Sequence, residues 1–289
     1  MIYKIENEFL KVEINSFGAE LKSLKKQNDD LEYLWSGDAK YWNRKAPVLF
    51  PIVGKLKDNF YIFNNKKYEM NQHGFARDKE FKVVEQGMDY VILLLESDEK
   101  TLEVYPFLFD FYISYKLENN KLITYYKVIN KSDNKIYFSL GAHPAFNWPI
   151  EKGKKSDYFL EFDFQDSLVS YKLENGCVGD EKVFFDLKDK KLTLTEELFS
   201  NDALIFEELS IKTITYKNSI DNRAIKLDFQ KFKYIGVWSK PSASPFLCLE
   251  PWCGIADFNN TNQKLEDKIG INKLDKDGVF EVDFTIELN

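Results

Sequence analysis

Apolar and polar residues alternate over short runs from one end of the chain to the other. Side chains along a β-strand point to opposite faces with a period of two. The alternation therefore predicts strands over residues 10–14, 109–117, 122–128 and 280–288. The polar residues Glu118 to Lys121 separate the second and third of these runs, which predicts a hairpin.

Shorter runs of the same kind predict further strands over residues 90–96, 135–140, 158–162, 212–216, 224–229 and 234–238. Helical periodicity is nearly absent, and we expect only two short helices, over residues 38–45 and 196–209. Because helices do not alternate with strands, a parallel sheet is disfavoured. No linker or repeat divides the chain. We therefore predict an all-β fold, a large antiparallel β-sandwich with few short helices, in a single domain over residues 1–289.

Composition and net charge limit the classes of molecule that the protein is expected to bind. Aromatic residues make up 16% of the 289 residues, which favours strands. The net charge of −7 argues against nucleic acid as a partner. No run approaches 18 apolar residues and no signal-peptide core is present, so we expect no membrane association and a cytoplasmic location. Three cysteines without CxxC spacing fit reduced thiols in that compartment.

Four segments interrupt the strand pattern with polar residues beside Gly, Pro or aromatic residues: 43–54, 72–77, 141–147 and 249–254. They contain both histidines of the protein, His73 and His143, and also Glu250, the one charge between Phe246 and Trp252. Histidine exchanges protons near neutral pH. A carboxylate among apolar neighbours has a raised pKa and is a better base than a solvated one. These residue types together allow general acid/base catalysis.

Each of these residues also has a purely structural interpretation. A histidine beside Gly or Pro is often a turn residue, and Glu250 could be an ion-pair partner. Arg77 offers donors suited to hydroxyls or carboxylates, but it could also pair with Asp78 or Glu80 on the surface. The residue types taken alone leave the two interpretations open.

Other chemistries fit the sequence poorly. Two histidines without a third ligand or an HExxH pattern make a zinc site improbable, and we expect no metal and no cofactor. No GxSxG, GxxxxGK[ST] or strand-linked GxGxxG motif occurs. Cys248 and Cys253 flank Glu250, but a free cysteine is more often a small buried apolar residue than a nucleophile.

Read in order, the interrupted segments resemble the aldose 1-epimerase (galactose mutarotase) superfamily, and in particular its LacX-like branch. The likeness extends over roughly residues 5 to 288. QHGFAR and GAHPAF in this order, with LEPW downstream, are its most specific motifs. The matching strings are NEFLKVEINSFGAELKSL (7–24), APVLFPIVGKLKDNFY (46–61), QHGFARDKEF (72–81), YPFLFDF (105–111), GAHPAFNWP (141–149) and FLCLEPWCGIADF (246–258).

The resemblance implies a galactose mutarotase-like supersandwich that binds a sugar in a cleft on a concave sheet. It implies that His143 is the general acid at the ring oxygen and that Glu250 is the base at the C1 hydroxyl. His73 would assist at the ring oxygen or position the C1 end, and Arg77 would bind sugar hydroxyls. Asp202 is the position we choose for the family's hydroxyl-binding aspartate.

The implied activity is the interconversion of the α and β anomers of a hexose, with neither metal nor nucleotide. Trp252 of the LEPW motif has an aromatic face suited to the C–H face of a sugar ring. A related branch acts on hexose 6-phosphates, for which Arg44, Lys45 and Lys55 are candidate phosphate ligands, although a solvated loop is the simpler interpretation. A non-catalytic sugar-binding sensor and an enzyme acting on another sugar derivative also stay open, as does the oligomeric state.

Overall fold

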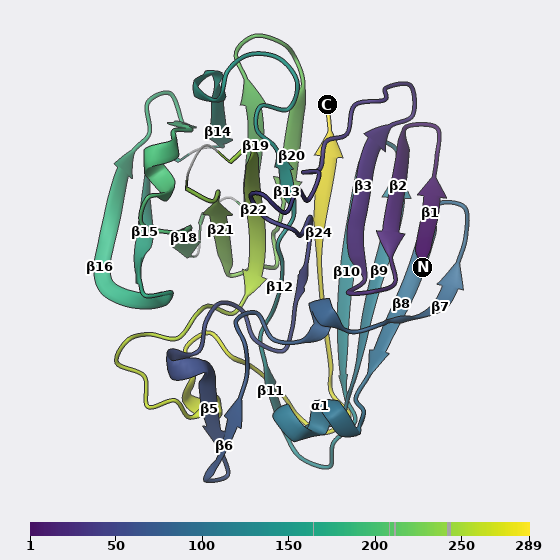
Figure 1. The fold of residues 1–289 in the computed structure, drawn as a ribbon, viewed down its shortest axis with the longest axis vertical. Helices are drawn as coiled ribbons and strands as arrows, with labels where there is room; N and C mark the ends of the chain where they lie inside the picture. Colours follow the sequence, from purple (N-terminus) through teal and green to yellow (C-terminus); the bar gives the residue numbers. More distant parts are fainter. Residues whose placement is uncertain (164, 208, 211, 242–243) are drawn as a thin grey trace.

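The computed structural model describes residues 1–163, 165–207, 209–210, 212–241 and 244–289. Two large sheets carry the fold, and their strands pair antiparallel throughout (Figure 1). The prediction of an all-β, antiparallel sandwich is thereby confirmed. Every strand predicted from alternation is present within a residue or two of its expected bounds, apart from 135–140, of which the central residues form a strand.

The larger sheet joins strands that are far apart in sequence. Its β24 strand lies between β20 and β10, so that Ile286 pairs with Leu227 on one side and Leu122 on the other. The predicted hairpin at Glu118 to Lys121 joins β9 to β10. Over the described residues the strand order is β17 (Lys191–Thr193), β14 (Tyr158–Phe162), β19 (Thr213–Asn218), β20 (Ala224–Asp228), β24 (Val279–Leu288), β10 (Lys121–Asn130), β9 (Phe109–Glu118), β8 (Tyr90–Glu96) and β7 (Lys82–Gln86).

The second large sheet carries the interrupted segments of the sequence. A short strand, β13 (Ala145–Asn147), pairs with β22 beside β12. In the described part of the chain the remaining order is β16 (Cys177–Asp186), β15 (Ser167–Glu174), β18 (Leu204–Glu207), β21 (Tyr234–Trp238), β22 (Phe246–Cys253), β12 (Leu140–Ala142) and β4 (Val48–Leu49).

Smaller elements flank these sheets. Three small sheets contain β1 (Ile2–Glu6), β2 (Leu10–Asn15) and β3 (Glu20–Lys26), then β5 (Phe60–Phe63) with β6 (Lys66–Glu69), and β11 (Ile136–Phe138) with β23 (Asn272–Leu274). The short helical segments are α1 (Glu99–Val104) and the 3₁₀ helices η1 (Lys57–Asn59), η2 (Ala76–Asp78), η3 (Lys155–Asp157), η4 (Glu196–Phe199) and η5 (Leu265–Asp267). None of the described helices is long and apolar enough to cross a membrane.

Both helix predictions are wrong in detail. Residues 38–45 form turns, in which the Trp42 N–H donates to the Asp38 carbonyl. Of residues 196–209, only η4 is helical, because the next buried residues pair into β18; residue 208 lies outside the described residues. The α1 helix was not predicted, although Asp98 caps it by accepting from the Thr101 N–H while the Thr101 hydroxyl accepts from the Asp98 N–H.

Strand β22 is buried on both faces, and alternation along it determines which of its side chains point toward the functional site. Leu247 and Leu249 join the large core between the sheets. The alternate residues Cys248, Glu250 and Trp252 therefore point to the opposite face of the sheet. That face is covered by the interrupted segments, and the result is a lined cavity rather than open solvent.

Candidate functional site

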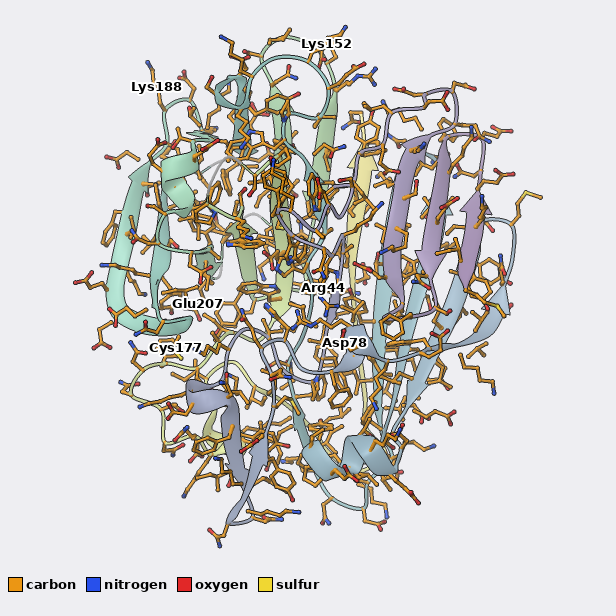
Figure 2. All side chains as sticks on the ribbon, in the orientation of Figure 1. Arg44, Asp78, Lys152, Cys177, Lys188 and Glu207 are labelled. Carbon is orange, nitrogen blue, oxygen red and sulfur yellow. The ribbon has the colours of Figure 1, made fainter. Side chains whose placement is uncertain are left out.

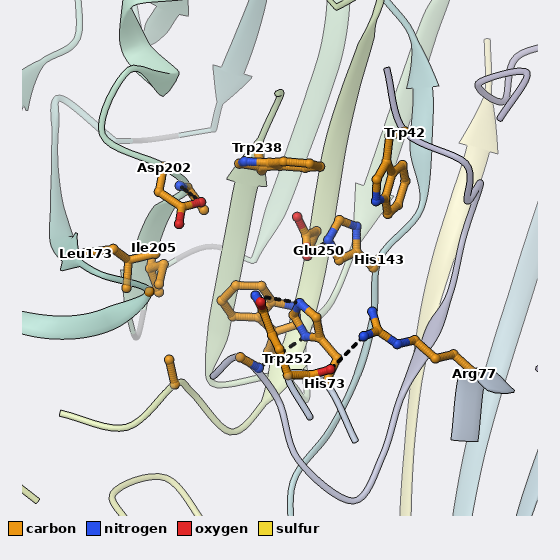
Figure 3. A pocket seen from close by; sticks show the side chains of 15 residues that line it. Trp42, His73, Arg77, His143, Leu173, Asp202, Ile205, Trp238, Glu250 and Trp252 are labelled. Carbon is orange, nitrogen blue, oxygen red and sulfur yellow. Dashed lines mark hydrogen bonds and ion pairs between the residues drawn. The ribbon is translucent and has the colours of Figure 1, made fainter. Parts of the chain in front are cut away.

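A cavity of about 300 Å³ lies over the outer face of the eight-stranded sheet. Six of the seven predicted site residues line it: His73, Arg77, His143, Asp202, Glu250 and Trp252 (Figure 3). They come from β22, from the β12–β13 junction, and from loops that are distant in sequence. The seventh, Arg44, is not among the lining residues.

His143 and Glu250 meet at the centre of the cavity. The Nε2 atom of His143 lies 3.1 Å from Oε2 of Glu250, and their side chains are only 8% and 1% exposed. Glu250 comes from β22, and His143 follows β12 directly. The two atoms are within ion-pair distance, but Oε2 of Glu250 has no hydrogen-bond partner among the described residues, so passing a proton between the two groups requires a small reorientation of their side chains.

Burial sets the protonation of this pair. It raises the pKa of the Glu250 carboxyl well above its ordinary value, with a further increase from the Asp202 carboxylate. Burial also lowers the pKa of His143 to about 3, and the positive charge of Arg77 adds to this effect. Both shifts favour the uncharged forms, a carboxylic acid beside a neutral imidazole, as the resting state of the pair. Moving its one proton to His143 leaves the total charge of the pair unchanged.

His73 is held in a fixed orientation beside His143. Its backbone is left-handed (φ +68°), and its Nδ1 atom accepts from the Gly54 N–H at 3.2 Å. Burial lowers the pKa of His73 well below its ordinary value, so the ring is neutral. Because Nδ1 accepts from a backbone N–H, the neutral ring carries its proton on Nε2, and this atom lies 3.2 Å from the side-chain nitrogen of Gln72. The His73 ring meets the His143 ring edge-on, with the two centroids 5.5 Å apart.

A buried ion pair supports the loop that holds His73. Gly54 is left-handed (φ +72°), and any Cβ there would lie 2.6 Å from the Ala256 Cβ. The adjoining Asp257 donates its N–H to the Lys55 carbonyl, while its Oδ2 accepts from the backbone N–H of Lys57. Its Oδ1 lies 2.7 Å from Nζ of Lys268, with both side chains 3% exposed. The loop is thus fixed by its packing and by a paired charge.

Tryptophan rings form much of the wall. Trp42 stacks on His143 with the ring centroids 4.8 Å apart, and Trp238 meets the same imidazole edge-on at 5.7 Å. Trp252 lies close against Gly236, where a Cβ would approach the indole to 2.7 Å. The predictions included Trp252 but missed Trp42 and Trp238. In the sequence, Trp42 is marked only by its position directly before the 43–54 segment, and Trp238 only by its position at the end of β21.

The arginines take different positions. Arg77 lines the cavity and donates to the Gln72 carbonyl at 2.7 Å, while its Nε lies 3.9 Å from Asp78. Arg44 instead donates to Asp78 at 2.8 Å, and the two lie side by side in Figure 2. Asp78 thus engages the guanidinium of Arg44 outside the cavity lining, and the substrate-binding role of Arg44 stays a prediction.

Asp202 marks the rim of the cavity. It is exposed, with a left-handed backbone (φ +78°), and its Oδ1 accepts from the Ala203 N–H at 2.9 Å. In Figure 3 it lies on the far side of Glu250 from Arg77. Polar side chains are thus present at both ends of a pocket that has His143 and Glu250 at its centre.

Comparison with known proteins agrees with this geometry. The sequence model of the family described as Aldose 1-epimerase matches residues 1–271. The plasmid-encoded protein LacX of Lactococcus lactis subsp. lactis is 32% identical over 284 residues, 95% of each chain. A galactose mutarotase related enzyme from Lactobacillus acidophilus is 34% identical and superposes with a TM-score of 0.96, covering 100% of this chain and 97% of its own. A galactose mutarotase-like protein from Lactobacillus casei is 30% identical, with a TM-score of 0.92 and full coverage of both chains.

Proposed function

The chain belongs to the aldose 1-epimerase family, and from that membership we propose that it interconverts the α and β anomers of an unphosphorylated hexose. The observation that carries this proposal is the buried contact of 3.1 Å between His143 and Glu250 at the centre of a cavity of about 300 Å³. That volume is at the lower end of the range for small-molecule pockets, as suits a single sugar. Mutarotation requires one acid and one base and no other reagent.

The proposed reaction begins when the proton of the resting pair passes from Glu250 to His143 as the sugar enters. The Glu250 carboxylate then takes the proton of the C1 hydroxyl while the His143 imidazolium protonates the ring oxygen. The bond between C1 and the ring oxygen breaks to give the free aldehyde. Rotation about C1–C2 presents the other carbonyl face, and closure with both proton transfers reversed gives the other anomer. Each positioned acid or base contributes about 10²–10⁴-fold.

The remaining lining residues hold the ring for this exchange. In the proposed complex the Nε2–H of His73, which lies beside the Gln72 amide in the free protein, donates to the ring oxygen and fixes the end of the sugar that reacts. Arg77 and Asp202 provide a donor and an acceptor for the hydroxyls at the two sides of the pocket. The indoles of Trp42 and Trp238 supply apolar faces against which the C–H groups of the ring pack.

A hexose 6-phosphate is the less favoured substrate. Its dianionic group needs free cationic side chains, and the three candidates are already engaged. Arg44 pairs with Asp78, Lys45 donates to the Lys22 carbonyl, and Lys55 donates to the Asn175 carbonyl. A non-catalytic sugar sensor is also less favoured, because sugar binding alone requires no acid matched to a base.

The test is anomer exchange measured by NMR, or by polarimetry, on fresh α-glucose, α-galactose and α-glucose 6-phosphate. We expect wild-type protein to accelerate exchange of at least one free hexose above the buffer rate. His143→Asn and Glu250→Gln should each lower kcat by about 10²–10⁴-fold.

The matched control is Glu118→Gln, which removes a carboxylate from the exposed β9–β10 turn and should leave the rate unchanged. If wild-type protein binds the sugars without accelerating their exchange, the enzymatic proposal fails. A rate confined to glucose 6-phosphate would instead overturn the assignment of an unphosphorylated substrate.

A further inference from the structure

A buried thiol lies beside the acid/base pair. Cys248 precedes Glu250 by two residues on β22, so strand alternation directs both side chains to the cavity face of the sheet. The register pairs Cys248 with Trp238 on one side and Ala145 on the other. Its side chain is fully buried beneath the pair, and the proposed reaction gives it no role.

Three different metal-binding atoms meet at this point. A ring nitrogen of His143, Sγ of Cys248 and a carboxylate oxygen of Glu250 all lie within 4.8 Å of one another. Across the described residues no other three His, Cys, Asp or Glu donors gather so closely. The sequence pattern argues against zinc because it shows no third ligand for the two histidines. The fold instead brings one of them, His143, together with a thiol and a carboxylate.

The donor set matches the preferences of zinc. Zn²⁺ binds imidazole nitrogen at about 2.0–2.1 Å, thiolate sulfur at about 2.3 Å and carboxylate oxygen at about 2.0–2.2 Å. Small side-chain rotations bring three atoms that lie within 4.8 Å to these distances from one ion. Three protein ligands leave the fourth tetrahedral position of a zinc ion free, and two of the three, His143 and Glu250, line the cavity.

We propose that His143, Cys248 and Glu250 form a Zn²⁺ site, and that zinc bound there inhibits the reaction of the sugar. Binding releases two protons to solvent, one from the Cys248 thiol and one from the Glu250 carboxyl. Two anionic ligands then balance the dication, so the buried site stays neutral overall. With Nε2 of His143 and the Glu250 oxygen coordinated to zinc, neither can exchange a proton with a sugar.

Metal binding is tested with Co²⁺, which takes the same kind of site as zinc and has visible absorption. We expect wild-type protein to develop a sulfur-to-cobalt charge-transfer band that excess Zn²⁺ abolishes. The band should be lost in both Cys248→Ser and Cys248→Ala. It should persist in Cys253→Ser, which removes another buried thiol that packs into the core on the other face of β22. No band in wild-type protein, or an equal band in Cys248→Ser, overturns the proposal.

Inhibition is tested separately, and this part rests on the proposed function. Micromolar Zn²⁺ should slow anomer exchange by the wild-type protein, and a chelator should restore the rate. Relative to its own rate without metal, Cys248→Ser should need at least tenfold more Zn²⁺ for the same inhibition. Equal sensitivity of the two proteins overturns the inhibitory role. If no sugar is turned over, the proposed function has failed, and the cobalt band still decides the metal site.

Discussion

The protonation of His143 follows from its burial more than from its neighbour. A carboxylate at hydrogen-bond distance would ordinarily keep an imidazole charged, but here both groups lie inside the protein and the neutral form of each is favoured. The pair stores a single proton that can be relocated without creating net charge. A sugar that places a hydroxyl at one group and its ring oxygen at the other stabilises the charged arrangement only while it is bound.

This has a measurable consequence for acid stability. The pKa of His143 is 6.5 in the unfolded chain and about 3 in the folded protein, so between these values the unfolded chain binds more protons and acidification favours unfolding. At pH 5 the cost is about 2 kcal/mol. Urea unfolding at pH 7.5 and pH 5 should therefore show wild-type protein losing about 2 kcal/mol more than His143→Asn. An equal loss in the two proteins would mean that His143 is not buried in its neutral form.

Rare residue types made the site partly predictable. Only two histidines occur, both beside glycine or proline, and one carboxylate interrupts an apolar run, so motif order was enough to select residues that share one cavity. Trp42 and Trp238 could not be selected, because a large aromatic residue is far more often core than ligand wall. The pairing of Arg44 with Asp78 could not be predicted, because the two residues are 34 positions apart in sequence.

At the scale of the elements, whether a strand can be predicted from the sequence depends on the environment of its two faces. Strands β9, β10 and β24 have one face toward the core and one toward solvent. Apolar and polar residues therefore alternate along them with a period of two. Strand β22 is buried on both faces, so its apolar run carries no period that separates strand from helix. Residues 38–45 look helical locally, but contacts around the cavity hold Trp42 in a turn.

The buried Asp257–Lys268 pair offers a test at this scale. Lys268→Met leaves the Asp257 carboxylate uncompensated at 3% exposure, and we expect a loss of about 3–5 kcal/mol in unfolding free energy. Lys276→Met, which breaks the solvent-exposed pair with Asp133, should cost less than about 1 kcal/mol. Urea titration of both variants provides the comparison. Similar losses would show that the buried pair does not hold the loop behind His73.

At the scale of the whole molecule, one core contains residues from both large sheets. The same cluster of buried side chains includes Ile5, Phe111, Leu249 and Leu288. Together with the prediction of a single domain over residues 1–289, this leads us to expect a single cooperative unfolding transition. The calorimetric and van't Hoff enthalpies should then agree. Two resolved transitions in the scan would contradict the prediction of one domain.

The central position of β24 bears on how the protein is made. Residues 279–288 fill the gap between β10 and β20, both of which leave the ribosome earlier. Until β24 emerges, β10 and β20 each lack the neighbour that β24 provides, and unpaired strand edges invite pairing with other chains. The larger sheet can therefore be completed only after residues 279–288 have been made.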